Sequence, residues 1–332
     1  MPAEPVQHTP FIFWVLFHIA VLIVLAFDLL VFHREAKPVT LREAATWTAI
    51  WVSLSLCFNA LVWHWKGAEK GVEFLTGYVI EYSLSVDNIF VFVLVFTYFR
   101  VPPQYQHRVL FWGVLGALLM RGTMIAFGVV LVNAFHWVLY LFGAFLVFTG
   151  MKMLFHKGVE VHPEANPLLG FCRRFFPICA RYEGARFVVK TEGKWMLTPL
   201  ALVLVVVEST DLVFAVDSIP AIFAITTDPF IVYTSNVCAV LGLRSLYFLL
   251  ANMVNRFVYL QTGLGFVLTF IGAKMLIADF WKMPTWMSLG AVVLILTVSI
   301  VASLLVSRKS APPPKAVQPA APTSDRSSAP PR

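Results

Sequence analysis

Charged residues are scarce in this chain, and apolar residues are unusually frequent. Of its 332 residues only 13% are charged and 59% are hydrophobic, and the mean hydropathy is +0.79. Soluble globular chains contain roughly 45–50% apolar residues, so this composition excludes a soluble protein. The apolar residues come in blocks of about 20, the length of a bilayer-spanning helix, and they lack the short alternation of outer-membrane strands. The sequence therefore predicts an all-α integral membrane protein.

Other absences narrow the function. The 4 cysteines are widely spaced, without a Cys-x-x-Cys pair, so neither a disulfide framework nor a zinc site is indicated. No nucleotide-binding loop occurs, which argues against ATP hydrolysis, and we expect no enzyme. The net charge of +7 comes from basic residues in short loops and at segment ends, not from a basic stripe, so we expect no nucleic-acid partner.

The apolar blocks predict about nine membrane-spanning helices. Their approximate ranges are 11–32, 44–64, 73–99, 109–132, 137–155, 195–218, 231–250, 260–278 and 285–307. The first block lacks a small-residue cleavage pattern, and no Lys or Arg precedes it, so we interpret it as a retained span and not as a signal peptide.

Loop charges predict the orientation. The basic residues that follow the odd-numbered spans are Arg34, Lys37, Arg42, Arg100, Arg108, Arg256, Arg308 and Lys309. Seven more lie in segment 156–194, which falls on the same side. Since Lys and Arg are enriched in cytoplasmic loops, we expect an external N-terminus and a cytoplasmic C-terminus. Residues 1–309 would form the membrane domain, and 310–332, rich in Pro, Ala and Ser, a disordered cytoplasmic tail.

An internal repeat links two parts of the membrane domain. The stretch EYSLSVDNI (81–89) matches DLVFAVDSI (211–219), and Arg121 in LGALLMRG corresponds to Arg244 in CAVLGLRS. Further on, FGAFLVFTGMKML (142–154) matches LGFVLTFIGAKML (264–276). The unit, 73–155 and again 195–278, contains three spans, so the two copies must enter the membrane from opposite sides. Inverted repeats of this kind are typical of secondary transporters, whose substrate site lies near the midplane between the copies.

The matched stretches carry charges where a bilayer-spanning helix should have none. Five acids fall in the third and sixth spans: Glu81, Asp87, Glu208, Asp211 and Asp217. One such charge costs roughly 2.5–3.5 kcal/mol at a helix centre, so five unpaired charges would cost on the order of 12–18 kcal/mol, as much as a domain's net stability of about 5–15 kcal/mol. Arg121 and Arg244 can balance two of them. The other acids need protons or a bound cation, and we interpret the cluster as a cation site with proton carriage as a companion role, ahead of a purely structural ion-pair network.

The neighbouring residues favour a hard metal ion. Asn88 and Ser218 would add neutral oxygen ligands to the five carboxylates, and His and Cys are missing from both stretches. Oxygen-only sites suit Mg²⁺, Ca²⁺ and Mn²⁺. Two residues six positions apart on a helix are rotated by about 240° about its axis, so the two acids of each stretch cannot share one face. Either the helix is surrounded by protein, or it unwinds locally. Pro220 and the TTDP stretch favour a break near the end of the sixth span.

At these residues the sequence resembles the TerC family, and in particular its Alx-like branch. The resemblance rests on FLTGYVIEYSLSVDNIFVF, HRVLFWGVLGALLMR, LFGAFLVFTGMKM, VFAVDSIPAIFAIT and FIGAKMLIADF, and it covers roughly residues 10–307. It implies a bacterial inner-membrane protein related to LysE-type exporters, Mn²⁺ export, and supply of metal to secreted enzymes. It also implies that the five transmembrane acids handle the metal.

Our sequence-based hypothesis is therefore a multi-pass inner-membrane exporter of Mn²⁺ that works by alternating access and is coupled to protons. Mn²⁺ is then a transported substrate, and no other cofactor is expected. Ca²⁺ as cargo stays open, as do two other functions: a non-transporting membrane partner that hands metal to secreted metalloenzymes or the translocation machinery, and a LysE-like amino-acid exporter. A tellurium oxyanion fits poorly, because carboxylates would repel it.

Overall fold

The computed structural model describes most of the membrane domain. The described residues are 9–32, 40–155, 166–179, 181–191, 193–251, 257, 259–281 and 283–309. The predicted disordered tail, 310–332, lies outside them, as do Arg34, Lys37 and Arg256.

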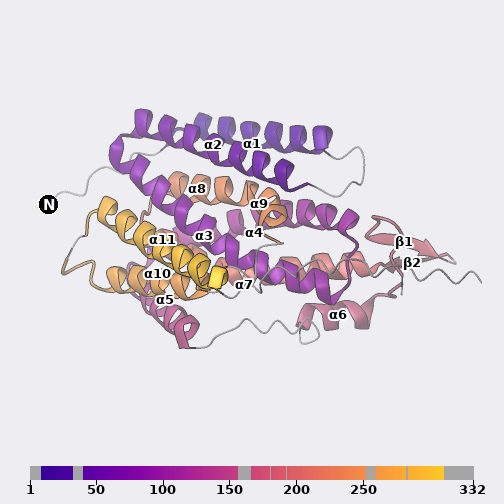
Figure 1. Ribbon diagram of the computed structural model, residues 1–332. Helices are drawn as coiled ribbons and strands as arrows, with labels where there is room; N and C mark the ends of the chain where they lie inside the picture. Colours follow the sequence, from indigo (N-terminus) through magenta and orange to yellow (C-terminus); the bar gives the residue numbers. More distant parts are fainter. Residues whose placement is uncertain are drawn as a thin grey trace, which may run out of the picture.

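Eleven helices and one short hairpin make up the described part of the chain (Figure 1). They are α1 (Phe11–Phe32), α2 (Leu41–Lys66), α3 (Ala68–Tyr98), α4 (Pro103–Ala134), α5 (Val138–Phe155), α6 (Pro167–Phe175), β1 (Val188–Thr191), β2 (Lys194–Leu197), α7 (Pro199–Phe223), α8 (Pro229–Leu241), α9 (Leu243–Leu250), α10 (Leu260–Leu276) and α11 (Thr285–Lys309).

The helices coincide with the predicted apolar blocks. Among the described residues, six helices are long and apolar enough to cross a membrane, namely α2, α3, α4, α5, α7 and α11. A seventh crossing results if α8 and α9 form one span, bent by 41° at Gly242. Shorter apolar stretches occupy Phe11–Ala26 and Leu260–Leu276. The structure is thus an all-helical membrane bundle with six or seven candidate spans, and the total of nine stays a prediction.

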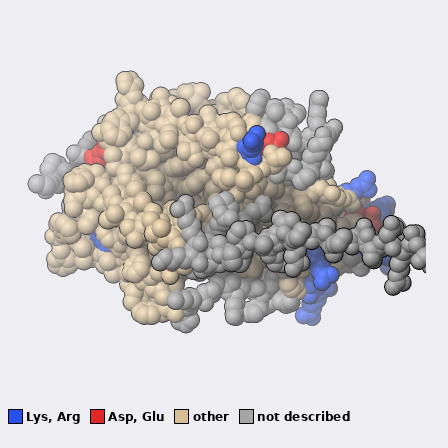
Figure 2. Space-filling view, viewed as in Figure 1, with Lys and Arg blue, Asp and Glu red and all other residues tan. Residues whose placement is uncertain are grey.

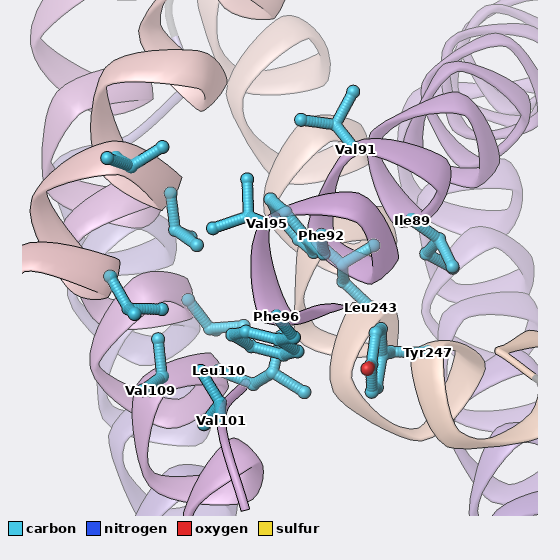
Figure 3. Close-up of a cluster of buried hydrophobic side chains, with 14 of the residues drawn as sticks. Ile89, Val91, Phe92, Val95, Phe96, Val101, Val109, Leu110, Leu243 and Tyr247 are labelled. Atoms are coloured by element: carbon cyan, nitrogen blue, oxygen red, sulfur yellow. The ribbon is translucent and has the colours of Figure 1, made fainter. Parts of the chain in front are cut away.

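Helix α3 lies at the centre of the bundle. It crosses between the α1–α2 layer and the α5, α10 and α11 group in Figure 1, and it contacts α2, α7, α8 and α11. Its C-terminal half contributes Phe92, Val95 and Phe96 to a buried cluster with α4 and α9 (Figure 3). Because α3 touches protein on several sides, it can bury acids on more than one face. This is the first of the two arrangements that the sequence allowed.

Helices α5 and α10 pack backbone to backbone. A Cβ added at Gly272 would lie 2.7 Å from the carbonyl oxygen of Gly143, and one at Gly150 would lie 2.7 Å from that of Gly265. Only glycine permits this approach, as at other close helix crossings in membranes. The residue earlier in α5 meets the residue later in α10, so the two helices run antiparallel.

The described residues between α5 and α7 form a short helix and a hairpin at one end of the bundle. Asn166 caps α6, accepting hydrogen bonds from the backbone N–H groups of Leu168 and Leu169, and β1 pairs antiparallel with β2. Tyr182 donates a hydrogen bond of 2.7 Å to the carbonyl of Phe99, which anchors this element to the α3–α4 connection. Lys and Arg gather at this end in Figure 2, whereas the rest of the visible described face is mostly uncharged apart from one charged group at the upper centre and small patches at the left.

The sixth span differs from its prediction at its start and at Pro220, whereas the break at the TTDP stretch is confirmed. The range 195–218 begins in strand β2, and α7 starts only at Pro199, at a helix position where proline's missing N–H costs nothing. The helix then runs through Pro220 without a break and ends at Phe223. Proline so near the C-terminus removes a single hydrogen bond, and only the stretch after it, up to the Asp228 cap of α8, leaves the helix.

Candidate cation site

Helices α3 and α7 carry the predicted acids into the interior. Glu81, Asp87, Asn88, Asp211 and Ser218 are buried, each with at most 8% of its surface exposed. Glu208 and Asp217 are half-buried. Because α3 and α7 are both continuous helices, these positions are fixed by helical spacing and by packing between the two helices.

Arg121 on α4 joins one acid from each matched stretch. Its guanidinium donates to both oxygens of Asp211, with Nε–Oδ2 at 3.2 Å and Nη2–Oδ1 at 3.1 Å. A further nitrogen, Nη1, bonds to Glu81 Oε1 and lies 3.4 Å from Ser218 Oγ. The fork of donors on arginine suits such a shared, bidentate site. One positive charge faces two negative ones, so this group keeps an excess of negative charge.

Two asparagines complete the surroundings of these carboxylates. Asn88 Nδ2 donates to Asp211 Oδ1 at 3.3 Å. Asn236 Nδ2, on α8, donates to Glu81 Oε2 at 3.0 Å. Sequence reasoning missed Asn236, since its stretch of α8 has no acid and no matched partner in the repeat. The only signal was an amide in a mostly apolar run, FIVYTSNVCAVLGL.

Asp87 and Asp217 form a second acidic pair. Their charges repel each other across the α3–α7 contact. Asp217 also lies beside the hydroxyl of Thr149 on α5. The ammonium of Lys152, on the same helix, attracts the charge of Asp217. The guanidinium of Arg121 bonds to neither member of this pair.

Glu208 lies against α4. A Cβ at Gly116 would fall 2.1 Å from Glu208 Oε1, so the glycine makes the room that this carboxylate occupies. The charge of Glu208 also repels that of Asp211. Arg244, the predicted counterpart of Arg121, is half-buried near the start of α9, just beyond the bend.

The predicted acids thus divide into neighbouring groups. Within the part of the chain that the structure describes, no three His, Cys, Asp or Glu side chains are arranged to hold a metal ion. The arginine-bound pair and the Asp87–Asp217 pair are both set between α3 and α7. A role for the seven predicted ligands in one metal site stays a prediction.

The comparisons with known proteins identify the family. The description "Integral membrane protein TerC family" matches residues 66–311, more than half of the chain. The chain belongs to the TerC family. A membrane protein of Myxococcus xanthus, itself uncharacterized, is 52% identical over 296 residues, covering 89% of this chain and 92% of its own.

Other TerC relatives include Alx proteins. The one from Escherichia coli K12, described as a candidate membrane-bound redox modulator, is 47% identical over 303 residues, which cover 89% of this chain and 94% of the relative. An uncharacterized membrane protein of Rickettsia bellii is 37% identical over 294 residues, 88% of this chain and 97% of its own. No solved structure matches. The chain is therefore a TerC-family, Alx-like multi-pass membrane protein, and no relative named here carries the name of an enzyme.

Proposed function

We propose that this protein exports a divalent cation, with Mn²⁺ as the physiological substrate, from the cytoplasm. The observation that carries the proposal is the pairing of equivalent acids from the two matched stretches. Glu81 and its counterpart Asp211 share one arginine, and Asp87 lies close enough to its counterpart Asp217 for their charges to repel each other. Excess carboxylates inside a membrane are costly and mark ion pathways.

The glycine contacts support the inverted repeat. Gly143 is equivalent to Gly265, and Gly150 to Gly272. In the structure Gly143 meets Gly272 and Gly150 meets Gly265. A two-fold axis between the copies produces this exchange, since a contact of one residue with a second implies the reciprocal contact. A pseudo-two-fold axis through the paired acids suits alternating access, in which one copy rocks against the other.

Nine spans with an external N-terminus and a cytoplasmic C-terminus complete the proposed topology. The contact between Tyr182 and Phe99 supports it, because it holds the basic residues near Tyr182 beside Arg100 in the α3–α4 connection and Arg108 in the second turn of α4. Both segments then face the cytoplasm, as the distribution of basic residues in membrane proteins favours.

The guanidinium of Arg121 would compete with the transported cation for carboxylate oxygens. The guanidinium occupies the oxygens that a cation would use, so binding of Mn²⁺ at Glu81 and Asp211 requires Arg121 to withdraw. The Asp87–Asp217 pair is free of that constraint. Proton coupling is the energy source we propose, with half-buried Glu208 or Asp217 as carrier, because protonation would also relieve the repulsion in an ion-free site.

The name given to the Alx relatives suggests redox modulation as another function. The chain's four cysteines are free, one exposed, two half-buried and one, Cys238, buried. No observation in the described residues favours thiol redox chemistry. Delivery of metal to secreted enzymes without transport remains the alternative proposal, and the same vesicle assay separates it from export.

The test is uptake of radioactive Mn²⁺ into inverted membrane vesicles that contain the full chain. We expect flux in the wild type, loss of flux in Asp87→Asn and Asp217→Asn, and normal flux in Asp279→Asn, a matched change at an exposed acid. Excess Ca²⁺ and Mg²⁺ should compete less well than unlabelled Mn²⁺. Absence of flux in the wild type favours the non-transporting partner, and flux stimulated by lysine but indifferent to Mn²⁺ favours amino-acid export.

A further inference from the structure

We propose that Asn236 belongs to the cation site, and that its side-chain carbonyl oxygen, together with that of Asn88, is a neutral ligand of the transported cation. The inference rests on the proposed export function and extends its ligand set to helix α8. It follows from three features of the two amides: their orientation, their burial and the chemistry of their free oxygens.

The neighbouring carboxylates fix the orientation of both amides. An ionised carboxylate only accepts hydrogen bonds, so the NH₂ group of Asn236 must face Glu81 and that of Asn88 must face Asp211. Rotating either amide by half a turn would place two oxygens against each other. The carbonyl oxygen of each amide is therefore held beside the acid cluster while pointing away from the carboxylate.

Those carbonyl oxygens have no hydrogen-bond donor. Asn236 is fully buried and Asn88 is 1% exposed, and both Oδ1 atoms lack a hydrogen-bond partner, as does Ser85 Oγ three residues before Asn88. A buried acceptor without a partner costs about 1–3 kcal/mol. Such groups beside a charged cluster indicate a binding partner that supplies a donor or a positive charge.

A divalent cation is a suitable partner for these two neutral oxygens. Mn²⁺ and Ca²⁺ bind six or more oxygen atoms, and amide carbonyls supply them without adding negative charge to a site that already has an excess. When Arg121 withdraws, Glu81 and Asp211 supply charged oxygens, and the two asparagines supply neutral ones on either side.

The residues before Asn236 on α8 show that its role is not shared by every polar side chain nearby. Thr234 and Ser235 are fully buried as well. Their hydroxyls donate to the carbonyls of Phe230 and Ile231 in the same helix, both at 2.7 Å. Asn236 instead directs its amide across to α3, so Thr234→Val is a matched control.

The experiment measures Mn²⁺ binding to the purified full chain in detergent, by the loss of the electron paramagnetic resonance signal of free Mn²⁺. We expect Asn236→Leu, which keeps the size and removes the oxygen, to weaken Mn²⁺ affinity by at least about tenfold. Thr234→Val should bind like the wild type.

Three outcomes are decisive. Wild-type affinity in a folded Asn236→Leu protein overturns the inference while export still stands. No Mn²⁺ binding by the wild type overturns both. If Asn236→Leu does not fold, wild-type protein with ¹³C-labelled asparagine decides. An infrared shift of the side-chain carbonyl band on adding Mn²⁺ supports ligation, and an unchanged band, as expected if the oxygens bond to ordered water, refutes it.

Discussion

Removing Arg121 should destabilise the protein more than removing any exposed basic residue. Arg121 is 2% exposed, and it bonds to Asp211 through two nitrogens and to Glu81 through a third. In Arg121→Met the side-chain volume is nearly kept, but two carboxylates stay in the interior without a countercharge. Breaking a buried ion pair in this way costs about 3–5 kcal/mol, and we expect the free energy of unfolding to fall by that amount.

The lost free energy of unfolding should be regained when the charges of Glu81 and Asp211 are also removed. In the triple variant with Arg121→Met, Glu81→Gln and Asp211→Asn, the polar groups can still bond to one another and no net charge is buried. Replacing all members of a buried ion pair by uncharged groups is often neutral. We therefore expect the triple variant to regain most of the lost stability while losing Mn²⁺ binding.

Unfolding monitored in mixed micelles by tryptophan fluorescence checks both variants. Arg108→Met, the same substitution at an exposed residue of the same helix that contacts the Phe187 ring, is the control and should change stability by less than about 1 kcal/mol. The reasoning fails if Arg121→Met is as stable as Arg108→Met, or if the triple variant is no more stable than the single one.

Other contacts make further predictions. Gly272→Val should separate α5 from α10 and lower the melting temperature by several degrees, whereas Gly290→Val, where a Cβ meets no atom within 4 Å, should leave it nearly unchanged. Lys66→Met should cost up to about 3 kcal/mol, because it leaves the partly buried Asp228, now 2.6 Å from the ammonium, without its countercharge. Asp228→Asn on that background, which can still cap α8, should restore part of the loss in the same unfolding assay. Gly116→Leu should displace the side chain of Glu208, which lies against α4, and reduce Mn²⁺ flux in vesicles. Protein yield is the control for folding.

Much of the fold could be predicted from the sequence because hydropathy fixes which segments enter a membrane. Each predicted span range holds a helix in the structure. Proline was a weaker guide: in α7 the hydrogen bond lost at Pro220 falls only three residues before the end of the helix, so it costs little and causes no break. The bend at Gly242 was missed because apolar residues continue on both sides of it.

The acids inside the bundle could also be predicted, because a charge inside an apolar span is conspicuous in any sequence. Asn236 could not be, since an amide costs less to bury than a charge and is common in helix interfaces of membrane proteins. Its importance depends on what lies opposite, and the contact with Glu81 joins residues 155 positions apart in the chain. Only the packing of α8 against α3 brings them together.

The two arginines show most clearly what the repeat alone leaves undetermined. Arg121 and Arg244 occupy equivalent positions in the sequence, which treats them as equal countercharges. In the structure Arg121 lies within the continuous helix α4 and reaches both α3 and α7, whereas Arg244 follows the bend between α8 and α9. A single guanidinium can fill the space between two equivalent carboxylates only from one side, so the symmetry of the acids is necessarily broken by the arginine that binds them. The number of charges follows from the sequence, whereas the packing decides which of the acids bind Arg121.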